Sequence, residues 1–227
     1  HELASVVSLP LLPNLYRKAA YHRRHPSAGF MGCWNFGNQL SANTAAFNFF
    51  LSADCPDDEA AALRRFGAAY FPGCQVDRLV DAWHQFLTAM DAYPFCIPFI
   101  YSGPMNYALA YCEPFVAGPL NGRPAGPSHL IVPRGDDLSG AFDAERNGYE
   151  ASALFPLDDI IIRMERLAAE WEAGCALLQQ ALETCAEDAA RLEVGNAWIC
   201  GAVWRSTAHA FKAYRLRREW TAARRAE

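Results

Sequence analysis

Three side chains at the end of a short apolar run could bind a ligand that has both a flat apolar face and hydroxyl groups. Residues 30–34 read FMGCW. Trp34 is the last residue of this run, and Asn35 and Asn38 follow it. An indole has a flat apolar face with an N–H donor at its edge, which suits stacking on a sugar ring. A carboxamide both donates and accepts hydrogen bonds, as sugar hydroxyls require. The alternatives are that Trp34 packs in the core and that the two asparagines only shape a tight turn around Gly37.

A second group of candidates lies in residues 93–111, an aromatic stretch that prolines interrupt. Tyr101 and Asn106 are the side chains of this stretch that we expect to reach a ligand. Prolines would stiffen the segment in either case. The alternative is that its aromatic side chains pack the helical part of the chain onto a neighbouring domain.

The sequence contains no motif for metal binding, for a nucleotide cofactor or for a nucleophilic serine. The eight cysteines are spread along the chain without a C-x-x-C pair, so we expect no zinc site and mostly buried, reduced thiols, as in an intracellular protein. His84 and His209 have no second ligand at a usual spacing, and residues 22–25 (HRRH) are expected to form a charged solvent face. This cysteine and histidine spacing predicts no metal site. No phosphate-binding loop, dinucleotide fingerprint or nucleophile elbow is present, so no cofactor is expected.

Residues 1–38 have the pattern of an α/β unit. Residues 1–12 indicate the end of a strand and a loop, residues 14–25 a helix between Pro13 and Pro26, and residues 30–34 a buried strand. Strand, helix and strand in this order indicate a parallel sheet.

The rest of the chain, residues 39–227, is predicted to be a helical C-terminal domain. Helices are expected over residues 41–51, from Pro56 onward, over residues 75–92, and from Pro156 to about Cys185. A last helix runs to the arginine-rich end, with a break expected at Gly195. Residues 113–150 are expected to form a long loop rich in proline and glycine. The predicted fold class is therefore mainly α with a short α/β start.

Composition narrows the function classes. The 227 residues carry 20 Lys and Arg against 25 Asp and Glu, a net charge of −5, which argues against nucleic-acid binding through phosphates and against a polybasic membrane role. Hydrophobic residues make up 52% of the chain, yet no apolar run is long enough to span a bilayer. We expect a cytoplasmic protein.

Several segments together resemble a family of bacterial proteins similar to glycoside hydrolases. They are HELASVVSLPLLPNLYRKAAYHRRHPSAGFMGCWNFGN at the start, then AWHQFLTAMDAYPF and PFIYSGPMNYALAY. The resemblance implies that residues 1–38 are the last βα units of a TIM-type barrel and that a helical domain follows. Such barrels place their active site at the carboxyl ends of the strands.

The resemblance also implies a catalytic residue. It places His1 and Glu2 after the penultimate strand, and residues 34–38 after the last one. Glycosidases commonly use two carboxylic groups, and Glu2 is the candidate for one of them, with His1 as a substrate-binding neighbour. The second carboxylate would lie in the missing part of the barrel. The alternative is that Glu2 is a surface or a substrate-binding residue.

Three interpretations stay open. Because the chain opens at His1 inside an apolar segment, we expect a C-terminal fragment of a carbohydrate-acting, glycoside-hydrolase-like protein that is inactive as an isolated piece. Its partners would be the carbohydrate and the missing N-terminal barrel region. The second interpretation is a non-catalytic helical module that packs on a partner domain. The third is a small-molecule enzyme of another class that uses one of the cysteines.

Overall fold

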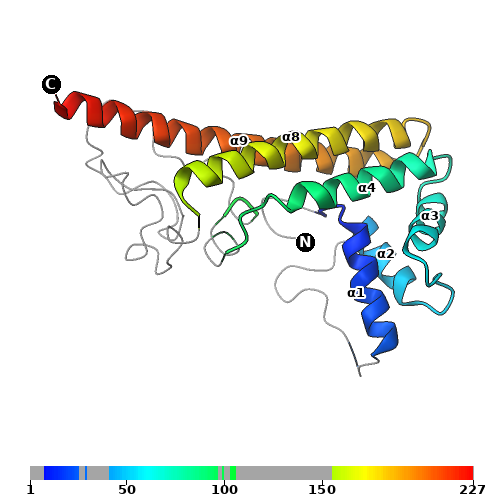
Figure 1. The fold of residues 1–227 in the computed structure, drawn as a ribbon. Helices are drawn as coiled ribbons and strands as arrows, with labels where there is room; N and C mark the ends of the chain where they lie inside the picture. Colours follow the sequence, from blue (N-terminus) through cyan, green and yellow to red (C-terminus); the bar gives the residue numbers. More distant parts are fainter. Residues whose placement is uncertain are drawn as a thin grey trace. The chain divides into compact units, whose positions relative to one another are not determined.

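A computed structural model describes residues 8–25, 29, 41–96, 99, 103–105 and 155–226 (Figure 1). These residues form helices joined by turns, and no β-strand occurs among them. The predicted mainly α fold is therefore confirmed. The predicted strands fall mostly on residues 1–7 and 30–34, which lie outside the described residues, so the α/β start stays a prediction without support from the described part. The same holds for the domain boundary at residue 38.

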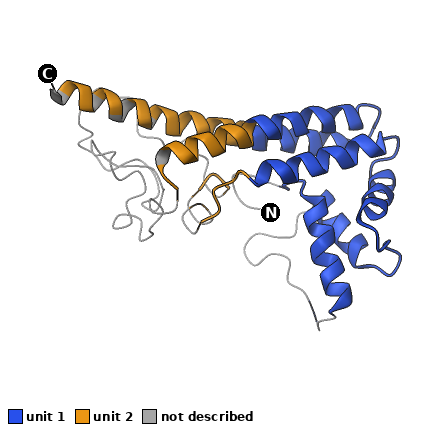
Figure 2. Ribbon diagram, viewed as in Figure 1, with its two compact units in different colours: residues 1–91, 169–201 blue, residues 92–168, 202–227 orange. Residues whose placement is uncertain are grey.

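The helices divide between two compact units, which are described separately (Figure 2). Unit 1 comprises residues 1–91 and 169–201, and unit 2 comprises residues 92–168 and 202–227. The helices are α1 (Leu12–Arg24), α2 (Ala42–Leu51), α3 (Glu59–Tyr70), α4 (Val76–Met90), α8 (Leu157–Leu182) and α9 (Asp188–Ala226). Helices α8 and α9 each contribute to both units.

The starts of α1 and α3 differ from prediction. Helix α1 begins at Leu12, so Pro13 lies in its first turn, where a missing N–H costs nothing. Helix α3 begins at Glu59 rather than at Pro56. The reason is that the Asp58 carboxylate accepts a hydrogen bond from the Ala61 amide at 2.7 Å and so caps the helix.

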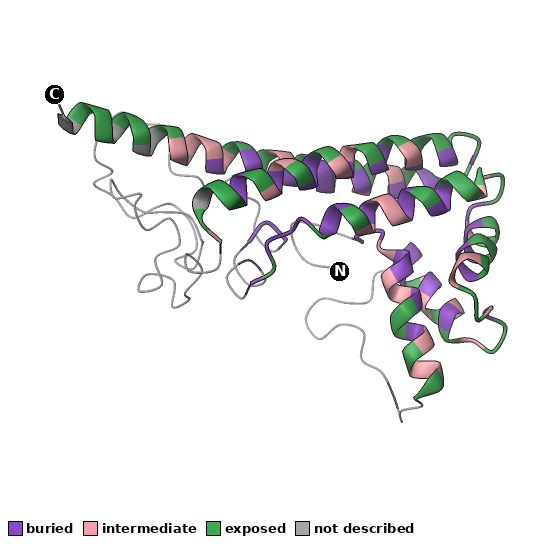
Figure 3. Cartoon of the chain, viewed as in Figure 1, coloured by how far each residue is buried: buried purple, intermediate pink, exposed green. Residues whose placement is uncertain are grey.

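The helices predicted from hydrophobic periodicity are confirmed. Helix α4 buries one face, which includes Leu79, Trp83 and Phe86, and Figure 3 shows buried and exposed positions recurring along it. Helix α8 follows Pro156 as predicted and ends at Leu182, and its apolar stripe is buried. Periodicity of 3.6 residues is a strong signal in both because one face of each meets the core.

Aromatic rings connect the helices of unit 1. Tyr16 of α1 meets Phe50 of α2 edge to face at 5.5 Å between ring centroids. Phe66 of α3 lies 5.8 Å from Phe50 and 6.3 Å from Trp83 of α4. Each such pair adds about 0.5–1.5 kcal/mol to the burial of the rings. These aromatic contacts therefore hold α1, α2, α3 and α4 together.

Trp171 joins α8 to both of its neighbours in unit 1. Its ring lies 4.5 Å from that of Phe86 on α4. Its indole N–H donates to the Ala197 carbonyl oxygen of α9 at 2.8 Å. The side chain is fully buried, so this hydrogen bond satisfies a donor that would otherwise be costly to bury.

The break predicted at Gly195 is wrong. Helix α9 continues from Asp188 to Ala226, and Gly195 lies exposed within it. A helical glycine costs only about 1 kcal/mol relative to alanine. Ala197 and Cys200, which follow Gly195 in α9, are buried. Their burial outweighs the cost of a glycine within the helix.

In unit 2 the first part of α8 packs with the second part of α9. Met164 and Leu167 of α8 and Trp204 and Phe211 of α9 are fully buried. At the rim, Lys212 forms an ion pair with Glu165, and Arg215 lies 3.5 Å from the Asp158 carboxylate. These surface pairs contribute little stability, so apolar burial carries the packing.

The described cysteines are free thiols, as predicted. Cys55, Cys96, Cys175, Cys185 and Cys200 are buried, and Cys74 is partly buried. Cys33 and Cys112 lie outside the described residues.

Candidate functional site

Each of the predicted site residues lies outside the described residues. They are His1, Glu2, Trp34, Asn35, Asn38, Tyr101 and Asn106. Their predicted roles therefore stay predictions. What the structure does describe is the framework that flanks them, and this framework has two parts, one in each unit.

The part in unit 1 is a buried hydrogen bond between Leu9 and α2. The Asn43 amide nitrogen donates to the Leu9 carbonyl oxygen at 2.9 Å. Both residues are buried. Leu9 follows residues 1–7 and Asn43 follows residues 30–40, so the two chain segments that hold Glu2 and Trp34 lead into neighbouring points of the structure.

Helix α2 starts directly after residues 30–40. Ser41 caps it, because its hydroxyl oxygen accepts from the Thr44 amide at 3.3 Å. The helix is then fixed against α1 by the contact of Phe50 with Tyr16. In sequence, residues 30–40 therefore precede a helix, α2, that packs on α1.

Asn43 is a residue that the sequence analysis missed. Its side-chain oxygen is buried and accepts no hydrogen bond from any described residue. A buried carboxamide oxygen normally has a donor, so this oxygen is an unsatisfied acceptor among the described residues. The available signal was the asparagine that opens the largely apolar stretch NTAAF, residues 43–47, where a polar side chain near a helix start suggests a specific partner.

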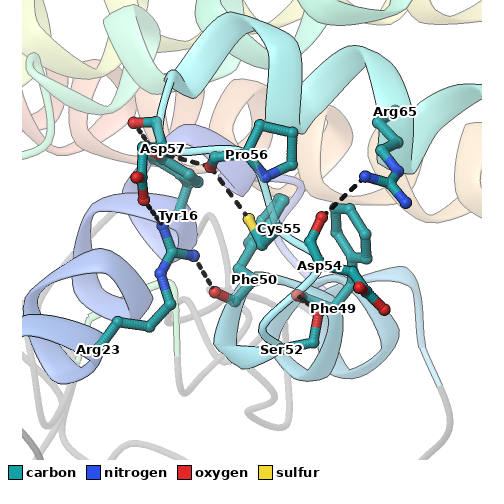
Figure 4. Close-up of polar contacts among 10 residues, drawn as sticks. All are labelled: Tyr16, Arg23, Phe49, Phe50, Ser52, Asp54, Cys55, Pro56, Asp57 and Arg65. Atoms are coloured by element: carbon teal, nitrogen blue, oxygen red, sulfur yellow. Dashed lines mark hydrogen bonds and ion pairs between the residues drawn. The ribbon is translucent and has the colours of Figure 1, made fainter.

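A polar cluster that includes two residues of α1 holds the turn between α2 and α3 (Figure 4). The Tyr16 hydroxyl donates to the Asp57 carbonyl oxygen at 2.5 Å. Arg23 donates to the Phe50 carbonyl oxygen and lies 3.3 Å from the Asp57 carboxylate. From α3, Arg65 donates to the Asp54 carbonyl oxygen at 2.8 Å. Most acceptors are backbone oxygens, so the cluster fixes a turn.

The same cluster corrects the prediction for residues 22–25. Arg24 and His25 are exposed as expected, but the Arg23 side chain is only 19% exposed. The periodicity of α1 could not show this, because the turn that covers Arg23 comes from residues far along the chain.

The part of the framework in unit 2 flanks Tyr101 and Asn106. The Tyr93 hydroxyl donates to the Phe99 carbonyl oxygen at 2.8 Å. The Tyr93 ring lies 5.8 Å from Trp204, and Phe99 stacks on Phe211 at 6.1 Å. A Cβ at Gly103 would lie 2.4 Å from the Phe99 carbonyl oxygen, so only glycine fits there.

The aromatic stretch therefore has a described, structural part. Tyr93 and Phe99 are 2% and 0% exposed and pack on α9, whereas Phe95 is 58% exposed. Burial raises the pKa of the Tyr93 phenol far above its ordinary value, and burial also raises the pKa of the Cys96 thiol. Both groups stay protonated at neutral pH and act as packing and hydrogen-bonding groups.

The described residues contain no group of three metal-ligating side chains close enough to hold an ion. His84 lies 4.0 Å from the Glu59 carboxylate and its side chain is 43% exposed. The described helices thus provide a framework for the candidate residues.

Comparisons of the chain with known protein families, with curated proteins and with solved structures find no match. Among the described residues, none of the helices combines the length and the apolar character that crossing a membrane requires.

Proposed function

We propose that this chain is the C-terminal part of a glycoside-hydrolase-like protein that acts on carbohydrate. In this proposal residues 1–38 are the last βα units of a barrel. Glu2 is one of its two catalytic carboxylates, and His1, Trp34, Asn35 and Asn38 bind the sugar. The chain by itself, which would lack the other carboxylate, is then inactive.

The resemblance of the segments that hold Glu2 and Trp34 carries this proposal, and the hydrogen bond between Asn43 and Leu9 is compatible with it. A glycosidase site needs groups from several strand ends brought together at one edge of a barrel. The two segments that hold Glu2 and Trp34 both continue into this buried 2.9 Å contact. This contact brings together the described ends of the two segments, and the resemblance of their sequences supports a common site and its chemistry.

Tyr101 and Asn106 are proposed as further sugar-binding residues. Their support is the rigid base formed by Tyr93 and Phe99 on α9. Tyr101 lies in sequence between Phe99 and Gly103, which are both described, and a side chain on a short segment fixed at its ends loses little entropy when it binds a ligand. The alternative, that the whole stretch only packs on α9, is supported by the burial of the same two rings.

The test is hydrolysis of a panel of aryl glycosides by the full-length parent protein and its variants. Glu2→Gln should lower kcat by about 10²–10⁴-fold, because proton transfer or nucleophilic attack is lost. Trp34→Ala should raise KM about tenfold, the equivalent of about 1.4 kcal/mol of stacking, with a smaller effect on kcat. Tyr101→Phe and Asn106→Ala should also act on KM.

The matched control is Glu183→Gln, which makes the same chemical change at an exposed turn residue. It should leave kcat unchanged. If the wild-type parent hydrolyses no glycoside of the panel, or if Glu2→Gln and Glu183→Gln behave alike, the catalytic proposal is wrong.

The second candidate function is a non-catalytic helical module that packs on a neighbouring domain of the same parent protein. Leu192 and Ile199, two turns apart on α9, are 65% and 54% exposed. Gly195 lies between them with open space around it. Such an exposed apolar strip on a helix marks a packing surface.

Limited proteolysis of the parent protein tests this candidate. In the double variant Leu192→Lys, Ile199→Lys, protease should cleave the domain junction at least several-fold faster than in the wild type. Glu183→Lys should leave the cleavage rate unchanged. Equal digestion rates for both variants would contradict a packing role for this strip.

A further inference from the structure

Two turns of unit 1, distant in sequence, are hydrogen-bonded to each other. One joins α3 to α4 and the other joins α8 to α9 (Figure 1). The Thr184 hydroxyl donates to the Gly73 carbonyl oxygen at 2.6 Å. The Gln75 amide donates to the Ala181 carbonyl oxygen at 2.9 Å. These bonds hold the two turns in register.

Each turn carries a cysteine, and the two cysteines share an acceptor. The Phe71 carbonyl oxygen accepts from the Cys74 amide at 3.1 Å and from the Cys185 thiol at 3.8 Å. The Cys185 sulfur therefore lies beside the Cys74 backbone. The Cys74 thiol contacts the Gly67 carbonyl oxygen at 3.7 Å. Gly67 lies in the last turn of α3, four residues before Phe71. Both thiols thus face the same end of α3.

We propose that Cys74 and Cys185 form a dithiol site that a low-molecular-weight disulfide, such as glutathione disulfide, converts to an intramolecular disulfide. A disulfide requires Cβ atoms roughly 3.5–4.5 Å apart. Gly73, at φ +85°, and the exposed residues 183 and 184 give both turns room to adjust.

The reaction proceeds by two exchange steps. The Cys74 thiolate attacks one sulfur of glutathione disulfide, and a glutathione thiolate leaves as a mixed disulfide forms. The Cys185 thiolate then attacks the Cys74 sulfur, and the second glutathione thiolate leaves. The two protons released by the cysteines pass to the two glutathione thiolates. The cysteines lose two electrons, and glutathione disulfide gains them.

Exposure decides which thiol reacts first. Cys74 is partly exposed, whereas Cys185 is 7% exposed and Cys175 and Cys200 are fully buried. Burial raises the pKa of the Cys74 thiol, so the first step is slower than for a free cysteine. The second step is intramolecular and fast by comparison, because the two turns are already held together.

The test uses the purified full chain incubated with glutathione disulfide, then alkylated, digested with trypsin and analysed by mass spectrometry. We expect a disulfide between peptides 66–78 and 167–191 that dithiothreitol removes. Peptide 167–191 also holds Cys175, so the Cys175→Ala variant assigns the bond to Cys185. The oxidised chain should also unfold at a temperature about 5 °C higher or more, because a long closed loop restricts the unfolded chain.

The single variants Cys74→Ser and Cys185→Ser are the controls. Each should lose both the linked peptides and the shift in unfolding temperature, while Cys175→Ala keeps both. The proposal is overturned if Cys74 and Cys185 remain fully alkylatable after oxidation. It is also overturned if either forms its disulfide with another cysteine, or if glutathione stays attached to Cys74.

Discussion

Gly174 of α8 lies directly against the ring of Phe86 on α4. A Cβ at position 174 would be 2.7 Å from Cε1 of that ring, closer than two carbon atoms can pack. Phe86 is fully buried and also contacts Trp171, so the ring cannot move away without disturbing the core of unit 1. The absence of a side chain at position 174 therefore sets how closely α4 and α8 approach.

Gly174→Ala should lower the free energy of unfolding by about 1–2 kcal/mol. Overpacking a core costs about 1–3 kcal/mol, and the better helix propensity of alanine returns up to about 1 kcal/mol. Urea unfolding followed by circular dichroism measures the change.

Gly195→Ala is the matched control, because it makes the same substitution in a helix where a Cβ meets nothing within 4 Å. This variant should gain about 0.5–1 kcal/mol. If both variants change stability in the same direction, the close contact between α4 and α8 is not as described.

Trp171→Phe should lower the free energy of unfolding by about 2–3 kcal/mol. The variant loses the buried hydrogen bond to the Ala197 carbonyl oxygen and leaves part of the indole volume empty. Trp198→Phe, at a tryptophan that is 41% exposed, should cost less than about 1 kcal/mol. Equal losses in the two variants, measured by urea unfolding, would argue against Trp171 as the link between α8 and α9.

Asp58→Ala should cost about 1 kcal/mol, because the α3 N-terminus loses its cap. Asp57→Ala removes only an exposed ion pair with Arg23 and should cost less than about 0.5 kcal/mol. Thermal unfolding of the two variants side by side makes the comparison. A larger loss of stability in Asp57→Ala than in Asp58→Ala would indicate that α3 begins near Pro56, as the sequence predicted.

Local sequence signals predicted which segments are helical better than they predicted the residues at which the helices begin and end. The hydrophobic periodicity of α4 and the proline that precedes α8, Pro156, were sufficient, since both signals depend on neighbouring residues. The cap by Asp58 was missed because Pro56 also fits a helix start. The continuity of α9 through Gly195 depends on packing with residues of other helices, which periodicity does not report.

For the candidate site too, the sequence could indicate candidate residues but not how the chain brings them together. Residue chemistry and resemblance singled out Trp34 and Tyr101, but such signals carry no information on which segments meet. The buried bond between Asn43 and Leu9 joins parts of the chain 34 positions apart, and only a three-dimensional arrangement can show such a contact.

Alkaline pH should destabilise the chain through its buried thiols. Burial raises the pKa of Cys175 from 9.0 to about 12, so the native state keeps a proton that the unfolded state releases above about pH 9. The stabilisation is fully present below the unfolded pKa and is lost as the pH rises toward 12. The slope for this thiol is at most about 1.4 kcal/mol per pH unit.

Urea unfolding at about pH 8 and about pH 10.5 measures this loss. The free energy of unfolding should fall with pH in the wild type and fall less steeply in Cys175→Ala. Parallel pH profiles for the two proteins would show that Cys175 does not titrate as its burial requires.

The most direct test of the proposed carbohydrate site is the kcat of the full-length parent on an aryl glycoside that it hydrolyses, with Glu2→Gln and Glu183→Gln compared. The account predicts a fall of about 10²–10⁴-fold for Glu2→Gln and no change for Glu183→Gln. A kcat for Glu2→Gln within about twofold of wild type would contradict it, and the helical packing module would then be the better description of this chain.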